Sequence, residues 1–320
     1  MVYAVISDTH ANREATQVVL ADIQEKGITE VYCIGDIIGY GPDPYACTQD
    51  VRKHCQGRIT KGNHELALQR VFEGKSLLMH NGPKQGIEHA NKKLWKSQKK
   101  FLISLPAELQ EGTRLFVHGN PAPDLPKIVS PKIIDIAKIN DYIISKDDYV
   151  GRSRVEYTEG GLRQMSLQIY DEAKINSIFD VMRKKGVQTC FTGHLHVAGC
   201  IGDYAEENLD YVPEIMLAHR PLLDKTPKEP ETFTFEKEPD KICLVFCGSV
   251  GQPRDRDNRA SYVIVEDDKI IWRRLPYDFE KTIQKMKLAG LPEKQAERLR
   301  YGKYPDDEGD LEELLKDFED

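Results

Sequence analysis

Two histidines, His194 and His196, lie one residue apart in the segment "FTGHLHVAG" (191–199), directly after a short apolar run. Side chains at positions i and i+2 of an extended segment project to the same side, so both imidazoles can point into one space. The segment "SDTH" near the N-terminus repeats this spacing with Asp8 and His10. Imidazole and carboxylate groups are ligands for divalent metals, although each pair alone is also compatible with a turn or a helix cap.

Metal-capable side chains follow five successive predicted strands. Short apolar runs at 2–7, 30–35, 57–60, 114–119 and 187–193 are expected to be these strands. The side chains at or just beyond their carboxyl ends are Asp8 and His10, Asp36, Asn63 and His64, His118, and His194 and His196. Ligands of α/β sheets bind at this edge of the sheet. Helix capping could explain one such side chain, but it does not readily explain side chains of this kind after five strands of one chain.

The number and type of these donors favour two metal ions. Two aspartates, one asparagine and up to five imidazoles are too many for one tetrahedral ion, and the set contains no thiolate. Manganese is therefore our first expectation, with iron, zinc or nickel as alternatives. A carboxylate shared by two ions about 3.5–4 Å apart is usual in hydrolytic sites, where it helps the ions to clamp phosphate and generate hydroxide.

The elements that must position these residues alternate along the first third of the chain. Helical apolar spacing at 11–26 and a proline in the first turn of 42–55 predict helices between the first three strands. This order favours parallel strands with helices packed on the sheet. Residues 66–105 and 171–186 are expected to be helical, and 242–275 is expected to contain three closing strands.

Charge and cysteine usage restrict the class of protein. The formal charge is -7, but residues 305–320 hold nine acids and one lysine, so the other 304 residues sum to +1. An acidic tail is usually solvated or an interaction segment, and nucleic acid is not expected as a partner.

Seven cysteines without a CxxC pair indicate buried reduced thiols. No apolar run approaches the roughly 20 residues of a membrane helix, so a cytoplasmic protein that does not bind membranes is expected.

The order of the motifs resembles the calcineurin-like metallophosphoesterase superfamily. The motifs are D-x-H at 8–10, GD at 35–36, GNHE at 62–65, a histidine before glycine at 118–119 and GHLH at 193–196. The resemblance runs from Met1 to about Ser261. It implies an α/β fold, a four-layer α-β-β-α sandwich of two mixed sheets, with a dinuclear metal site at the carboxyl ends of the strands.

The resemblance also implies a role for each motif residue. The first metal would be held by Asp8, His10 and His196, the second by Asn63, His118 and His194, and Asp36 would bridge them. His64 resembles the catalytic histidine of the family, which contacts the phosphate and assists the leaving oxygen. The implied mechanism is direct attack by a metal-bridging hydroxide, without a covalent enzyme intermediate.

One motif departs from part of this superfamily. Its protein serine/threonine phosphatases carry GDxVDRG, whereas this chain reads "GDIIGYGPDP", with Gly39 and Tyr40 in place of the second aspartate and the arginine. Segments reaching about Lys303 instead resemble a smaller bacterial-type branch of phosphodiesterases and dinucleoside polyphosphate hydrolases. The expected function is hydrolysis of phosphomonoester, phosphodiester or polyphosphate bonds. The alternatives are a protein phosphatase and a noncatalytic scaffold.

Three further residues are candidates for contact with the phosphate groups of a substrate. Asn12 and Arg13 begin the first predicted helix, where backbone N–H groups favour anions, although Arg13 could equally be a solvated surface residue. Arg254 follows a strand in "QPRDRD" and could reach a phosphate, with self-pairing to its acidic neighbours as the alternative. Tyr40 could stack on a base or only close its turn. The expected substrate is a phosphorylated small molecule or nucleotide, with a phosphoprotein as the alternative.

The domain organisation follows from these segments. Residues 1–278 are expected to form the metallophosphoesterase domain, with insertions at about 120–170 and 198–241. The first insertion could contain a helix at 131–144 and a strand at 165–170, and the second is expected to have at most local hairpins. A helical extension is expected at 279–304 and an acidic tail at 305–320.

Overall fold

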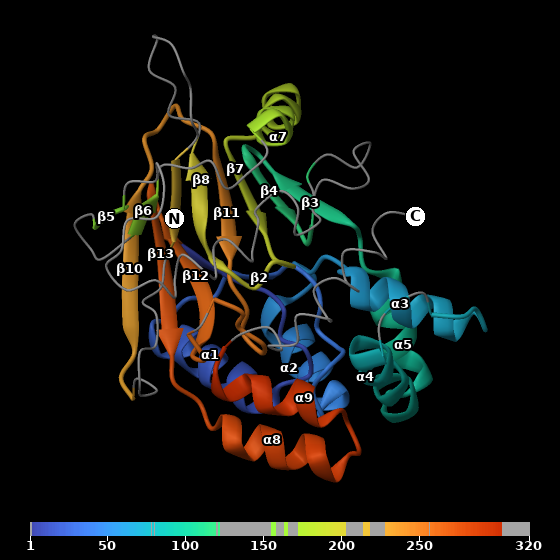
Figure 1. The fold of residues 1–320 in the computed structure, drawn as a ribbon. Helices are drawn as coiled ribbons and strands as arrows, with labels where there is room; N and C mark the ends of the chain where they lie inside the picture. Colours follow the sequence, from blue (N-terminus) through green and yellow to red (C-terminus); the bar gives the residue numbers. More distant parts are fainter. Residues whose placement is uncertain are drawn as a thin grey trace.

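The computed structural model contains two β-sheets that pack face to face, with helices outside them (Figure 1). The acidic tail, and parts of both predicted insertions, lie outside the residues that the structure describes. The described residues are 2–77, 79, 81–119, 121, 155–157, 163–165, 172–202, 214–217, 228–255 and 257–302. Among them, no helix is both long and apolar enough to span a bilayer.

The first sheet is mixed and has the strand order β10-β13-β12-β1-β2. Its strands are β1 (Val2–Ile6), β2 (Val31–Cys33), β10 (Glu231–Glu236), β12 (Ala260–Glu266) and β13 (Lys269–Leu275). β1 and β2 run parallel, as the βαβ pattern predicted, and the other neighbours are antiparallel. The strand predicted at 57–60 is reduced to a single bridge between Ile59 and Cys33, so that prediction was wrong in extent.

The second sheet is also mixed and has the order β3-β4-β7-β11-β8-β9-β6-β5. Its strands are β3 (Glu108–Glu111), β4 (Arg114–Val117), β5 (Val155–Tyr157), β6 (Arg163–Met165), β7 (Thr189–Thr192), β8 (Ala198–Gly202), β9 (Glu214–Leu217) and β11 (Cys243–Cys247). β4, β7 and β11 are parallel, and the rest are antiparallel.

Three strands within 198–241, β8, β9 and β10, belong to these sheets, which corrects the prediction of an insertion with at most local hairpins. β8 pairs with β11 and with β9, while β10 pairs with β13 in the first sheet. Prolines and charges between the strands concealed them in the sequence, because short strands separated by such segments lack a clear apolar period.

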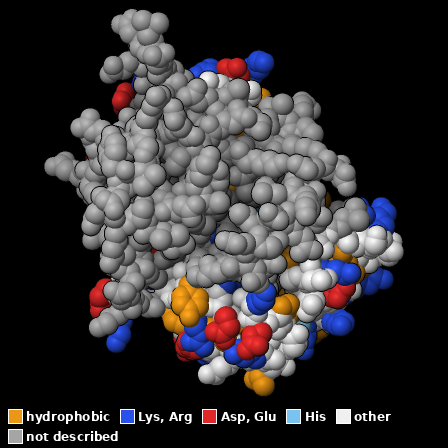
Figure 2. Space-filling view, in the orientation of Figure 1, with side chains coloured by type: hydrophobic (Ala, Val, Ile, Leu, Met, Phe, Trp, Pro, Cys, Tyr) orange, Lys and Arg blue, Asp and Glu red, His pale blue; other side chains and the backbone are white. Residues whose placement is uncertain are grey.

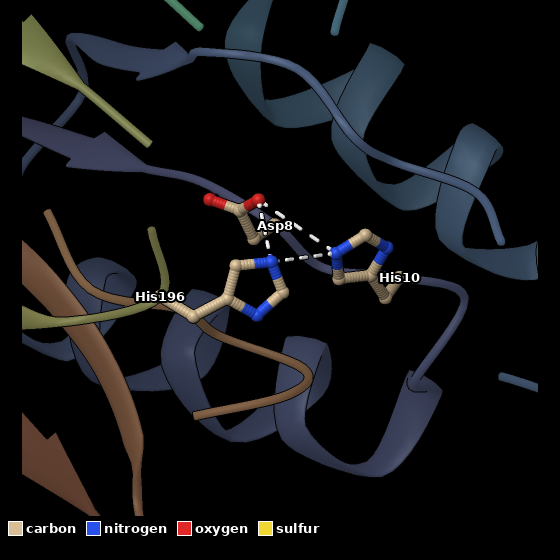
Figure 3. Close-up of side chains that lie close together, drawn as sticks. All are labelled: Asp8, His10 and His196. Carbon is tan, nitrogen blue, oxygen red and sulfur yellow. Dashed lines mark hydrogen bonds and ion pairs between the residues drawn. The ribbon is translucent and has the colours of Figure 1, made fainter. Parts of the chain in front are cut away.

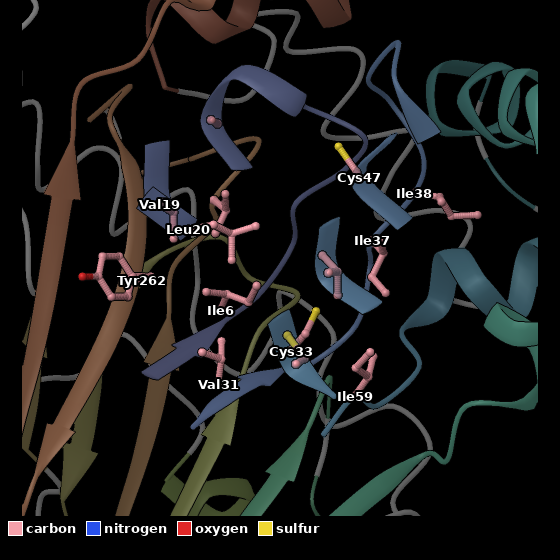
Figure 4. Close-up of a cluster of buried hydrophobic side chains, with 14 of the residues drawn as sticks. Ile6, Val19, Leu20, Val31, Cys33, Ile37, Ile38, Cys47, Ile59 and Tyr262 are labelled. Carbon is pink, nitrogen blue, oxygen red and sulfur yellow. The ribbon is translucent and has the colours of Figure 1, made fainter. Parts of the chain in front are cut away.

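The helices lie on the outer faces of the sheets. They are α1 (Arg13–Glu25), α2 (Pro44–Cys55), α3 (Asn63–Phe72), α4 (Asn81–Lys93), α5 (Lys96–Ser104), α7 (Glu172–Lys184), α8 (Phe279–Leu288), α9 (Glu293–Glu297) and the 3-10 turn η1 (Arg298–Arg300). α1 contacts β12 and α8, and α2 contacts β2. Figure 4 shows Val19 and Leu20 of α1 and Cys47 of α2 in one apolar cluster with Ile6 and Val31 of the first sheet.

The period of two along β1 divides its side chains between two cores. Ala4 and Ile6 face the helices, while Tyr3 and Val5 face the second sheet. Between the sheets, the Phe116 ring on β4 stacks 3.9 Å from Tyr32 and 5.2 Å from Phe191.

The other face of the second sheet is covered as well. Leu115, Cys190 and Leu244 are buried there, and α7, drawn beside β7 in Figure 1, buries Phe179 and Met182. The structure therefore confirms the predicted α-β-β-α sandwich. All seven cysteines are buried and free, as predicted.

The C-terminal helices present a charged outer surface. Figure 2 shows basic and acidic side chains side by side over α8 and α9. Lys287 pairs with Glu293 and Glu297, and Arg300 pairs with Glu280. Exposed pairs of this kind contribute at most about 1 kcal/mol each, so the buried contacts of these helices matter more for the site.

Candidate metal centre

Asp8, His10 and His196 form one cluster of converging donor atoms (Figure 3). The Nε2 atom of His196 lies 3.1 Å from Asp8 Oδ1, and the Nε2 atom of His10 lies 3.7 Å from the same oxygen. The two Nε2 atoms are 3.1 Å apart. The loops after β1 and β7 thus bring Asp8, His10 and His196 together in a geometry that could hold a cation.

A second cluster contains Asp36, Asn63, His118 and His194. The Nε2 atom of His118 lies 3.2 Å from Asp36 Oδ2 and 3.1 Å from Asn63 Oδ1. The Nδ1 atom of His194 lies 3.0 Å from the same Asn63 oxygen. The loops after β2, β4 and β7 and the first turn of α3 supply these four side chains.

Asp36 stands between the two clusters. Its Oδ2 atom is 3.2 Å from His118 Nε2 of the second cluster and 3.8 Å from His10 Nε2 of the first. One carboxylate oxygen therefore faces donors from both clusters, which is the placement that a bridging ligand requires.

Backbone carbonyls orient three of the imidazoles. A ring nitrogen that donates to a carbonyl leaves its other nitrogen with a lone pair, which fixes the ring for metal binding. The contacts are His10 Nδ1 with the Ile38 carbonyl (3.2 Å), His118 Nδ1 with the Ile34 carbonyl (2.8 Å) and His196 Nδ1 with the Gln252 carbonyl (2.5 Å). In each case Nε2 points into its cluster.

Burial keeps three of the imidazoles neutral. It lowers the pKa of His10 well below its usual value, that of His196 to about 4 and that of His194 to about 3. Metal ligation requires neutral imidazoles, so these three are ready to bind at neutral pH.

The carboxylates give the site its negative charge. Burial alone would lower the pKa of His118, but Asp36 and Asp8 outweigh it and raise the pKa to about 10. Two fully buried carboxylates are costly without nearby cations. Neutral imidazoles, carboxylates and an amide oxygen without a thiolate fit a pair of divalent ions.

The backbone is strained at five of these residues. Positive φ angles occur at Asp8 (53°), His10 (45°), Asp36 (51°), His194 (66°) and His196 (58°). Residues other than glycine pay roughly 1–2 kcal/mol for this conformation. Such strain persists where the surroundings over-determine the backbone, and it concentrates at functional sites.

His64 lies beside both clusters in the first turn of α3. Its Nε2 atom is 3.8 Å from Asp36 Oδ2, and its ring centre is 4.7 Å from that of His10. Its Nδ1 atom is buried and has no hydrogen-bond partner among the described residues. A Cβ atom on Gly39 would overlap this Nδ1, so glycine at position 39 makes room for the ring.

Glu65 is a residue of the site that our sequence reasoning missed. It is completely buried, and its carboxylate accepts hydrogen bonds from the backbone N–H groups of Gly62 (2.8 Å), Asp36 (2.9 Å), Ile37 (2.9 Å) and Ile38 (3.4 Å). It thereby joins the loop after β2 to the start of α3. The signal was present in "GNHE", where the acid occupies the third helical position of a capping box.

The three predicted substrate contacts lie in different environments in the structure. Asn12 caps α1, accepting from Ala15 N (3.2 Å) and donating to Gly251 O (2.8 Å) with 1% of its surface exposed, so a substrate contact is not supported. Arg13 is exposed in the first turn of α1, as its solvated alternative predicted. Arg254 is buried, and its backbone N–H donates to His196 O (3.1 Å).

The guanidinium of Arg254 also faces the site. It donates to Tyr40 Oη (3.3 Å) and to Gln252 Oε1 (2.9 Å). The acidic neighbours of Arg254 pair with other arginines: Asp255 with Arg274, and Asp257 with Arg259. Arg254 is a candidate for contact with an anion because its guanidinium lies beside Tyr40 at the metal centre.

Comparison with known proteins gives a consistent result. Residues 1–198 match the family model described as calcineurin-like phosphoesterase. An uncharacterized protein of Methanocaldococcus jannaschii is 30% identical over 314 residues, which cover 94% of this chain and 98% of that protein. A solved metallophosphoesterase from Sphaerobacter thermophilus is 27% identical, with a TM-score of 0.62 over 94% of this chain and 100% of that chain. A hypothetical protein from Pyrococcus horikoshii is 16% identical and shares the fold, with a TM-score of 0.58 over 95% of this chain and 99% of that chain.

Proposed function

Because this chain belongs to the calcineurin-like phosphoesterase family, we propose that it is a two-metal enzyme that hydrolyses phosphomonoester, phosphodiester or polyphosphate bonds. The observation that carries the proposal is the position of Asp36, whose Oδ2 atom faces both donor clusters. Family membership and the aspartate–histidine clusters together indicate divalent metal binding.

The residues that would hold the metals are those of the two clusters. The first ion would be held by Asp8, His10 and His196, and the second by Asn63, His118 and His194, with Asp36 between them. Two divalent ions would lower the pKa of a water molecule and offset negative charge on the phosphoryl oxygens. Manganese is our first choice for this donor set, with iron, zinc or nickel as alternatives.

The remaining residues act on the phosphoryl group and its leaving oxygen. His64 lies beside Asp36, where its imidazole would donate a hydrogen bond or a proton to the departing oxygen. Arg254 would contribute a guanidinium to a neighbouring phosphoryl group of the substrate, since arginine pairs well with phosphate. The buried surroundings strengthen both interactions, because they exclude water.

The complete set of donors favours an enzyme over a scaffold on the same fold. A scaffold has no need of His64, nor of the costly positive φ angles at five proposed ligands. Gly39 and Tyr40 in place of aspartate and arginine argue against a dedicated protein phosphatase. We therefore propose a phosphorylated small molecule or nucleotide as the substrate, with a phosphoprotein as the alternative.

The experiment is an assay of metal-loaded protein against p-nitrophenyl phosphate, bis(p-nitrophenyl) phosphate, a dinucleoside polyphosphate and a phosphopeptide. Asp36→Asn should lose bound metal and lower turnover by about 10²-fold or more. His64→Asn should keep its metal and lower turnover by about 10²- to 10⁴-fold.

The control is His54→Asn, because His54 lies near the end of α2 and its Nδ1 atom contacts the Asp50 carbonyl. This variant should behave as the wild type. Undiminished turnover in Asp36→Asn would contradict the proposal. A wild-type protein that binds no metal and hydrolyses none of the four compounds would favour the scaffold.

A further inference from the structure

The C-terminal arm, residues 277–302 with α8, α9 and η1, is anchored on the segment that follows the first cluster. Thr282 Oγ1 donates to Asn12 Oδ1 (3.0 Å), and Lys285 Nζ lies 3.1 Å from both carboxylate oxygens of Glu14. These contacts hold the arm against the N-terminal turn of α1. The arm lies beyond residues 1–198, which match the family model.

The arm places Arg298 near the metal centre. Arg298 is 5% exposed, and its Nη1 atom donates to Gln295 Oε1 (2.7 Å). Its guanidinium carbon lies 5.9 Å from the centre of the Tyr40 ring. The end of η1 is fixed in turn, because Asn258 Nδ2 donates to the Arg300 carbonyl (2.9 Å).

A second arginine reaches the same ring from another part of the chain. The guanidinium carbon of Arg254 lies 5.7 Å from the Tyr40 ring centre. Arginine is rarely so buried, and both distances are within the range of a cation–π interaction. Two buried positive charges thus share one aromatic side chain.

Tyr40 connects these arginines to the proposed metal ligands. Its ring centre lies 4.8 Å from that of His10 and 4.9 Å from that of His64. Its φ angle is 55°, a strained conformation for a bulky residue. A Cβ atom on Gly86 of α4 would overlap the Tyr40 backbone, so close packing holds this conformation.

From this arrangement we propose that Tyr40, Arg254 and Arg298 form a phosphate subsite next to the metal centre. The subsite would take a second phosphoryl group of a substrate with a di- or polyphosphate chain, while the metal centre holds the phosphoryl group that is cleaved. The inference rests on the proposed function. Guanidinium groups suit this role because their planar N–H groups pair bidentately with phosphate oxygens.

The direct test is the binding of AMP and ADP, which differ only by the second phosphoryl group. Calorimetric titration of the metal-loaded protein in a His64→Asn background limits turnover during the measurement. Arg298→Met should weaken ADP binding about tenfold, as expected when one charge-assisted contact is lost, and should change AMP binding by less than about twofold. The ADP affinity of Arg298→Lys should lie between those of the wild type and Arg298→Met, because lysine keeps the positive charge but lacks the planar guanidinium.

The matched control is Arg300→Met, two residues further along the chain. Arg300 pairs with Glu280 and Glu297 at the surface, so its loss should change the binding of neither nucleotide. Each variant is also checked by thermal unfolding, so that a loss of fold is not read as a loss of the subsite.

Two results would overturn the subsite. If Arg298→Met lost the same factor of affinity for AMP and for ADP, Arg298 would serve the first phosphoryl group. If the variant lost no affinity for either nucleotide, Arg298 would be a structural residue. Failure of the proposed function gives a different result, because the wild type would then hydrolyse no phosphoester. That outcome is independent of whether Arg298→Met lowers the affinity for ADP relative to AMP.

Discussion

Replacement of Glu65 by glutamine removes one hydrogen-bond acceptor from a completely buried position and keeps the shape of the side chain. Oε1 of Glu65 accepts from the N–H groups of Ile37 and Ile38, and Oε2 accepts from those of Asp36 and Gly62. Glutamine keeps one oxygen and sets its NH2 group against the other pair of donors. Whichever way the amide turns, two buried N–H groups lose their acceptor.

The expected loss of free energy of unfolding follows from these two N–H groups without an acceptor. A buried donor without a partner costs about 1–3 kcal/mol, so the variant should lose about 2–6 kcal/mol of its free energy of unfolding. Each kcal/mol lowers Tm by about 2–4 °C in a domain of 150–250 residues, so we expect a decrease of at least about 4 °C. The metal affinity should also fall, by about 10- to 100-fold, because the same bonds position Asp36 and the start of α3.

The assay combines thermal unfolding by circular dichroism with a metal titration of both proteins. Glu73→Gln is the control, since Glu73 is exposed at the end of α3 and should change stability by less than about 0.5 kcal/mol. If Glu65→Gln unfolded at the wild-type temperature and bound metal with wild-type affinity, the structural role assigned to Glu65 would be wrong.

Three further changes have separate readouts. Gly39→Ala should displace the His64 ring, and should lower kcat about tenfold or more while metal content stays the same; unchanged kcat would refute the close packing of these residues. Burial would raise the pKa of Asp22, but hydrogen bonds from Arg273 and Tyr262 outweigh it and lower the pKa, so this carboxylate stabilises the fold above its unfolded pKa and the benefit disappears as pH falls through the lower folded value. Asp22→Asn should therefore be less stable than the wild type in urea at about pH 7, and this difference in stability should shrink as the pH falls below the unfolded pKa of about 3.9. A difference in stability that is the same at low pH as at pH 7 would contradict this ionic origin. Removal of metal by a chelator should lower the free energy of unfolding, by about 2.7 kcal/mol for each of the two sites relative to protein at a free metal concentration of 100 Kd, whereas a protein without metal sites would show no change.

The proposed metal ligands could be identified from the sequence because their signals are local. Asp8, His10, Asp36, His194 and His196 lie at or just after the carboxyl ends of strands, and the βαβ order places such ends along one edge. The structure brings these residues together as predicted.

Other features depended on tertiary contacts that no local pattern encodes. The approach of Arg298 to Tyr40 depends on how the C-terminal arm docks, which is decided by pairs such as Lys285 with Glu14. The strands within 198–241 were missed because their partners are far away in the sequence, so that pairing rather than local apolar spacing defines them.

The metal content of the purified, manganese-reconstituted protein tests the central claim most directly. Elemental analysis by mass spectrometry should find two ions per chain in the wild type and fewer in Asp36→Asn, and hydrolysis of p-nitrophenyl phosphate should fall with the metal content. Fewer than one ion per wild-type chain, or equal hydrolysis after the metal has been removed, would contradict a two-metal phosphoesterase.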